Sequence, residues 1–165
     1  MNDEVKDTWV EQIIQSFPDY AVQLGADLHL AINTPILDEI DIHACALAAA
    51  IAAGNGALAY EIGMNGPLRR TNEREIAFKA ASVMGKNNVW NNFTKIAGGD
   101  TLLSSDEDNR QKFEMYALAA SIVGNDSISI KSYCTSLLGL GLSLEQLQHI
   151  GKLAAIVAAI GKTTP

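Results

Sequence analysis

The chain has 165 residues, of which 48% are apolar, 19% are charged and 6% are aromatic. A single domain of this length buries about two-thirds of the surface that its unfolded chain exposes. A core rich in alanine and poor in aromatics favours helices packed on helices over a β-sandwich. With 12 basic and 19 acidic residues the net charge is −7, which argues against nucleic acid or an anionic membrane as a partner.

Targeting segments and metal motifs are not expected. The longest apolar run, Cys45 to Ala53, is about half the length that a membrane span needs, and the first residues lack the pattern of a signal peptide. The sequence therefore predicts no membrane association and a cytoplasmic location. The three histidines lack ligand-like spacing and no Cys-x-x-Cys is present, so we expect no metal and no cofactor.

Apolar residues recur at intervals of three and four, which is typical of helices. A first helix is expected through Trp9, Ile13 and Ile14, and a second from Pro18, because proline in the first turn of a helix costs no hydrogen bond. The following elements are a break at 33–35, a helix from Asp38 that stops at Gly54-Asn55-Gly56, and a short helix that ends before Pro67.

The second part of the chain continues this pattern. Asn72, three residues before Glu75, predicts the cap of a helix that ends at Gly85, and a separate short helix is expected over 87–96. The longest linker, 98–108, follows. Three more helices are expected over 113–123, 126–138 and 143–160, the last opened by the capping box Ser143-x-x-Gln146.

An internal repeat relates the two parts. The segment 46–55 is echoed by 117–125 at an offset of 71, with one residue fewer before the Gly-Asn stop, and the segment around Glu73 is echoed by that around Glu145 at an offset of 72. Alanine-rich helices can resemble one another by chance, but two echoes in the same order favour duplication. We predict one all-α domain, 1–165, built from related helical units of about 38–100 and 105–161 that pack face to face.

Four segments together resemble the alkyl hydroperoxide reductase D family of the carboxymuconolactone decarboxylase-like superfamily. The most specific is Met84-Gly-x-Asn87-Asn88-Val89, and the others are Phe17-Pro-Asp-Tyr20, the helix at 47–55 and the helix at 113–121. The resemblance implies an all-helical fold made of a duplicated unit, a trimeric assembly, and antioxidant peroxidase chemistry. That chemistry uses a glutamate, a Cys-x-x-Cys twelve residues later at a helix start, and a histidine four residues after the second cysteine.

This chain departs from the family motif at the thiols. Aligned without a gap, Glu114 matches the glutamate, but Asp126 and Ser129 stand at the two cysteine positions and Tyr133 at the histidine position. Cys134 is one residue beyond that position, about 100° further around the helix, and Cys45 belongs to the other repeat unit. Neither cysteine has a neighbouring thiol in the sequence with which to form the resolving disulfide.

Structural roles are open to the same residues. Asp126 can cap a helix N-terminus and complement its dipole, Ser129 lacks an adjacent histidine base, and Cys134 can be an inert thiol. Glu114 lies among apolar neighbours, so we expect a buried carboxylate that needs a partner. Positions 126, 129 and 133 share one helix face, and we expect Tyr133 to donate a hydrogen bond of about 2.7 Å to Glu114.

Three functional hypotheses follow. The first is a degenerate family member with a binding or regulatory role near peroxide defence, assembled as a trimer or a multiple of it, with a peroxiredoxin as the candidate partner. The second is an enzyme with different chemistry, in which Glu114 and Asp126 transfer protons. The third is a weak peroxidase that uses Cys134 alone with an external thiol.

Overall fold

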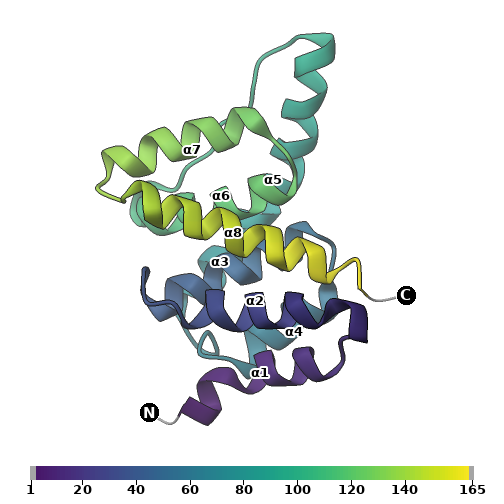
Figure 1. Ribbon diagram of the computed structural model, residues 1–165. Helices are drawn as coiled ribbons and strands as arrows, with labels where there is room; N and C mark the ends of the chain where they lie inside the picture. Colours follow the sequence, from purple (N-terminus) through teal and green to yellow (C-terminus); the bar gives the residue numbers. More distant parts are fainter. Residues whose placement is uncertain (1–2, 164–165) are drawn as a thin grey trace.

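The computed structural model describes residues 3–163, and within this range it contains helices and no strand (Figure 1). This confirms the prediction of an all-α, AhpD-like fold. None of the described helices is long and apolar enough to cross a membrane. The helices are α1 (Asp3–Gln15), α2 (Val22–Asn33), α3 (Glu39–Ala52), α4 (Gly56–Asn65), α5 (Asn72–Ala97), α6 (Arg110–Val123), α7 (Ser127–Gly139) and α8 (Leu144–Ile160), with 3-10 turns at Asp19–Ala21 and Glu107–Asn109.

The centre of the molecule is the pair α3 and α6, which pack against each other and against α5 and α8. In α3 every residue from Ile42 to Ala50 is buried, and in α6 every residue from Phe113 to Ser121. A helix buried on all sides cannot show an apolar stripe. Alanine makes this arrangement possible, because its small side chain lets neighbouring helix axes approach closely.

Helix α5 differs most from expectation. It is one continuous helix of 26 residues, whereas the sequence predicted two helices separated at Gly85. Gly85 lies in mid-helix with nothing within 4 Å of its Cβ position, so it acts as an ordinary helical residue. The cap is Thr71, whose side chain accepts from the Arg74 amide, rather than Asn72. The C-terminal half of α5 projects beyond the body of the molecule (Figure 1).

The turn between α3 and α4 and the turn between α6 and α7 have the same geometry. Asn55, with φ −94° and ψ 81°, caps α4, and Asp126, with φ −92° and ψ 86°, caps α7. Each accepts a 3.1 Å hydrogen bond from the amide three residues later, and the residue before each has a positive φ, 72° at Gly54 and 53° at Asn125. The offset is 126 − 55 = 71 with no deletion, so the alignment of Gly54-Asn55 with Gly124-Asn125 was wrong by one residue. The duplication itself stays a proposal.

The turn at Gly124 is packed closely against α5. A Cβ at this position would lie 2.2 Å from Asn88 Nδ2. We expect Gly124→Ala to lower the free energy of unfolding by roughly 1–3 kcal/mol, the usual cost of overpacking. Gly85→Ala is the matched control, and it should raise the stability by about 0.5–1 kcal/mol because alanine is the better helix former. Urea unfolding of both variants measures this, and equal stability of Gly124→Ala and the parent would contradict the packing.

Candidate functional site

A row of asparagines on α5 organises the region of the motif positions. The Nδ2 groups of Asn88 and Asn92 donate to the carbonyls of Ala120, at 3.2 Å, and Gly124, at 3.0 Å. These two bonds join α5 to the end of α6, just before the turn into α7. Asparagine is unfavourable in a helix interior because its side chain competes for backbone hydrogen bonds, so four asparagines within six residues indicate tertiary partners.

The linker 98–106 is an ordered strap that runs back along α5. Trp90 Nε1 donates to the Asp100 carbonyl at 2.7 Å, and Asn87 Nδ2 donates to Ser104 Oγ at 2.9 Å. Nearer the start of α5, Lys79 Nζ contacts Asp106 Oδ2 at 2.9 Å. Lys79 lowers the pKa of the Asp106 carboxyl mainly through this hydrogen bond. These contacts hold the strap along α5 from Trp90 back to Lys79.

Asp126 and Ser129, at the two cysteine positions, meet Asn91 in a closed hydrogen-bond network. Ser129 Oγ donates to Asp126 Oδ2 at 2.7 Å, and the Ser129 amide donates to Asp126 Oδ1 at 3.1 Å. Asn91 Nδ2 lies 3.0 Å from Asp126 Oδ2 and 3.2 Å from Ser129 Oγ. Asn91 also exchanges two bonds with the backbone of Leu102 in the strap. All three side chains of the network are 0% exposed.

The contacts of this network indicate a structural role. Asp126 is the N-cap of α7, as the sequence predicted, and a carboxylate there also complements the helix dipole. Both of its oxygens accept hydrogen bonds from Ser129. A hydroxyl beside a carboxylate can be a nucleophile when a substrate reaches it, but these atoms have no exposed surface. The described geometry therefore stabilises the α6–α7 turn and the strap.

Glu114 is buried and paired, as expected, but its partners were not foreseen. Ser136 Oγ lies 3.0 Å from both carboxylate oxygens, and Arg110 Nε lies 3.4 Å from Oε2. Arg110 also donates to Ser136 Oγ at 3.0 Å, so the three side chains form a separate cluster on α6 and α7. The guanidinium of Arg110, one turn earlier on the same helix, neutralises the Glu114 carboxylate.

The predicted bond between Tyr133 and Glu114 is wrong. Tyr133 Oη donates instead to the Ser104 carbonyl in the strap, at 2.7 Å, and lies 3.4 Å from Met84 Sδ. The strap lies where the hydroxyl points, and a backbone carbonyl without a helical partner is a good acceptor. Burial, and secondarily the Glu114 carboxylate, raises the pKa of Tyr133 to about 12. Tyr133 is thus a neutral donor at physiological pH.

Neither cysteine is an activated thiol. Cys134, on α7, is partly buried, and this burial raises its pKa above the ordinary value. Cys45 is buried in α3 and its pKa is raised further, first by burial and then by the Asp41 carboxylate. Its sulfur lies 3.8 Å from the Met115 carbonyl. Reactive cysteines have lowered pKa values and access to solvent, and both conditions fail at Cys45.

The rate of alkylation against pH tests this description of the thiols. Iodoacetamide should modify Cys134 with a midpoint above pH 9.0, the unperturbed value, because burial disfavours the thiolate. Cys45 should remain unmodified in the folded protein and react only in denaturant. Mass spectrometry of the digested protein separates the two sites, and Cys134→Ser is the control. A midpoint below about pH 8.5, the ordinary value of a free thiol, would show an activated thiolate that the described contacts do not explain.

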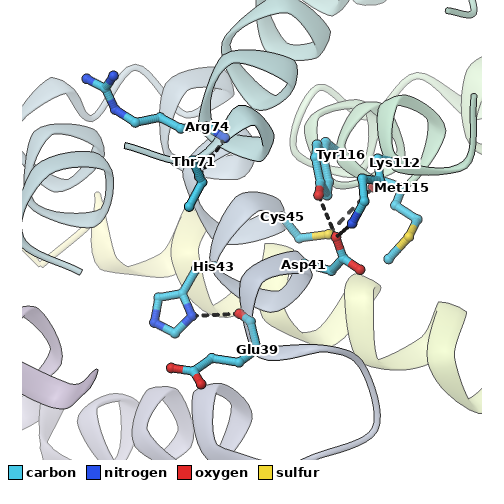
Figure 2. Close-up of polar contacts among 9 residues, drawn as sticks. All are labelled: Glu39, Asp41, His43, Cys45, Thr71, Arg74, Lys112, Met115 and Tyr116. Carbon is cyan, nitrogen blue, oxygen red and sulfur yellow. Dashed lines mark hydrogen bonds and ion pairs between the residues drawn. The ribbon is translucent and has the colours of Figure 1, made fainter. Parts of the chain in front are cut away.

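A second polar cluster joins the two halves at the other end of α3 and α6 (Figure 2). Asp41 Oδ1 accepts from Tyr116 Oη at 2.5 Å and from Lys112 Nζ at 2.8 Å. Burial and the Asp41 carboxylate raise the pKa of Tyr116. Burial, the largest single influence, would lower the pKa of Lys112, but the hydrogen bond to Asp41 and the nearby carboxylates of Asp41, Glu73 and Asp38 together raise that pKa. Sequence analysis did not find this cluster.

The four motif positions are therefore divided among three contacts. The structure brings Asp126 and Ser129 together, holds Glu114 in a different cluster, and bonds Tyr133 to the strap. Asn91 was missed, although the spacing of Asn87 and Asn91, and of Asn88 and Asn92, at i and i+4 was a usable signal. Among residues 9–163, whose side chains the structure describes, no group of three or more His, Cys, Asp or Glu is arranged to hold a metal ion.

Comparisons with known proteins agree with this fold. No family model matches the chain. Curated relatives named alkyl hydroperoxide reductase AhpD match nearly the whole chain, at 26% identity over 92% of it and 88% of the relative from Rhodospirillum centenum, and at 26% over 93% and 91% for Gluconacetobacter diazotrophicus. The AhpD of Mycobacterium marinum is 25% identical over 93% of this chain and 92% of its own length. On these matches, the chain is similar over nearly its whole length to alkyl hydroperoxide reductases of the AhpD family, which supports its membership of that family.

Proposed function

We propose that this protein is a non-thiol member of the family, which keeps the fold and has a binding or regulatory role near peroxide defence. The observation that carries the proposal is the network of Asn91, Asp126 and Ser129. At the positions that the resemblance assigns to the thiol pair, the chain has a carboxylate and a hydroxyl that satisfy each other and have no exposed surface. The relatives' name supports the link to peroxide defence.

The chemistry of thiol peroxidases supports the same proposal. Reduction of a peroxide by a dithiol ends in a disulfide, so it needs a second thiol within about 6 Å between Cα atoms. The chain has two cysteines. One lies on α7 and is partly exposed, and the other lies in the buried centre of α3.

The two alternative functions are less well supported. Proton transfer by Glu114 and Asp126 requires that substrate reach a carboxylate oxygen, but Asp126 is fully buried and Glu114 is nearly so. A peroxidase that uses Cys134 alone requires thiolate at neutral pH, and the raised pKa of Cys134 disfavours it. Neither alternative has an observation in its favour comparable to the closed network.

Consumption of peroxide with a dithiol donor tests the proposal. The native protein, with hydrogen peroxide or tert-butyl hydroperoxide and dihydrolipoamide, should give a rate equal to the background without protein. Cys134→Ser should give the same rate, since no cysteine is used. Turnover that Cys134→Ser abolishes would contradict the proposal in favour of a one-cysteine mechanism. Turnover that survives replacement of both cysteines would contradict it as well, and would indicate a peroxidase mechanism that does not use a thiol.

We also propose that the protein self-associates through the projecting half of α5, as a trimer or a multiple of it, and that it works in the cytoplasm with a peroxiredoxin as candidate partner. An apolar stripe on this half supports the assembly: Val89, Phe93 and Ile96 are 71%, 54% and 91% exposed. Val89 and Phe93, together with Gly85, Lys86 and Trp90, border a depression of about 570 Å³. Exposed apolar patches rimmed by polar residues mark association sites.

A further inference from the structure

The Asp41 cluster opens onto a cavity that none of the motif residues lines. The cavity has a volume of about 480 Å³ and lies where both halves meet, between the α2–α3 loop, the start of α3, α6, the α7–α8 loop and the start of α8. Its side chains include two carboxylates, Asp38 and Asp41, and the amides of Gln111 and Gln146. Cavities of this size accommodate small molecules.

The geometry of Asp41 leaves one oxygen for a ligand. Oδ1 accepts the bonds from Lys112 and Tyr116, and among the described residues no hydrogen bond reaches Oδ2. Figure 2 shows Oδ2 directed away from both donors. The side chain is held in place and only 14% exposed, so its remaining oxygen is preorganised toward the cavity that it lines.

The charge of the cavity selects the kind of ligand. Two of its described lining residues are acidic and none is basic. Lys112, which does not line the cavity, bonds the Oδ1 side of Asp41 and is also close enough for the Asp38 charge to raise its pKa. Two carboxylates against this one ammonium leave the cavity with an excess of negative charge. Asp38 is the N-cap of α3 but makes no side-chain capping bond, so its carboxylate is not committed to the helix. A partly desolvated carboxylate with an open acceptor favours a charged donor over a neutral one.

We propose that this cavity binds a small ligand that carries a protonated amine, with Asp41 Oδ2 accepting its hydrogen bond and Asp38 adding a second negative charge. The inference extends the proposed binding role by naming a ligand class and a site. It does not depend on the residues at the thiol positions, because none of them lines the cavity.

A matched series of probes tests the assignment. The ¹⁵N-labelled full-length protein is titrated at pH 7 with 1,4-diaminobutane, with the neutral 1,4-butanediol and with succinate, and amide shifts are followed by NMR. Diaminobutane should cause saturable shifts at Leu140, Gly141 and Leu142, which line the cavity. The diol should bind at least 10-fold more weakly, and succinate should cause no shifts there. Raising the salt concentration should weaken the binding of the diamine, because salt screens the attraction between its charges and the carboxylates.

Two substitutions and a control assign the contact. Asp41→Asn should weaken the binding of diaminobutane at least 10-fold. Asp38→Asn, which removes no hydrogen bond of the fold, should weaken this binding several-fold and leave the melting temperature unchanged. Asp27→Asn, in a different cavity between α2 and α8, should bind like the parent. Absent saturable shifts, or equal affinity for diamine and diol, would overturn the inference. Peroxide turnover by a protein that binds the diamine would contradict the proposed function and leave this site standing.

Discussion

Replacing Asn91 by alanine is expected to lower the free energy of unfolding by about 3 kcal/mol or more, because hydrogen bonds to a buried charged group are each worth roughly 1.5–3 kcal/mol. The Asn91 amide group bonds Asp126, Ser129 and the Leu102 backbone, and it thereby joins α5 to both the start of α7 and the strap. Its loss leaves a buried carboxylate with one donor fewer and frees the strap at Leu102.

Asn92→Ala is the matched control, since the partly exposed amide of the adjacent residue makes one bond to another element, at Gly124, besides an exposed bond from Lys95 in its own helix. The Asn92→Ala substitution should lower the free energy of unfolding by about 1 kcal/mol. Chemical denaturation compares the two variants, and hydrogen exchange at Leu102 reports the strap directly. Equal costs for Asn91→Ala and Asn92→Ala would mean that the network does not hold the fold.

Breaking the apolar stripe on α5 is expected to convert the proposed trimer to monomers. The double substitution Val89→Glu and Phe93→Glu places two charges, one turn apart, at residues that are well exposed in the isolated chain. Light scattering should give the native protein about three times the chain mass of 17.6 kDa and the variant a single chain mass. Folding should be unaffected because neither side chain belongs to the core.

Tyr60→Glu is the control for the stripe. Tyr60 is a comparably exposed large side chain, but it lies on α4, so the substitution should leave the mass of the assembly unchanged. A native protein that scatters as a monomer at micromolar concentration would contradict the proposed assembly. Loss of assembly on Tyr60→Glu alone would move the interface away from α5.

Most of the helices could be predicted because their ends carry strong local signals. The break at Asn33-Thr34-Pro35, the Asp126 cap and the capping box of Ser143 and Gln146 were all found in the sequence and are confirmed. Helix α5 was divided wrongly at Gly85, because a glycine is read as a stop when the tertiary bonds that hold the helix on either side are unknown. Those bonds come from asparagines, whose partners lie more than ten residues away.

The site was less predictable for the same physical reason. That Glu114 is buried and paired followed from its apolar neighbours, but its choice of Arg110 and Ser136 over Tyr133 depends on the crossing of α6 and α7. The Tyr133 bond depends on a strap that the sequence presents only as a linker of glycines and acids. Asp41 is 71 residues from Lys112 and 75 from Tyr116 along the chain, and only the packing of α3 on α6 brings it to them.

The central claim is that the positions of the family's thiols are buried and inaccessible to solvent in this chain. The reactivity of a thiol placed at position 129 tests it most directly. Ser129→Cys, combined with Cys134→Ser, introduces a thiol at one of those positions with little change in volume, and Cys45 in the same molecule is an internal buried reference. Under native conditions the account predicts that this thiol reacts with a disulfide reagent only as the protein unfolds, orders of magnitude more slowly than Cys134 in the parent. Modification of the folded protein as fast as that of Cys134 would contradict it.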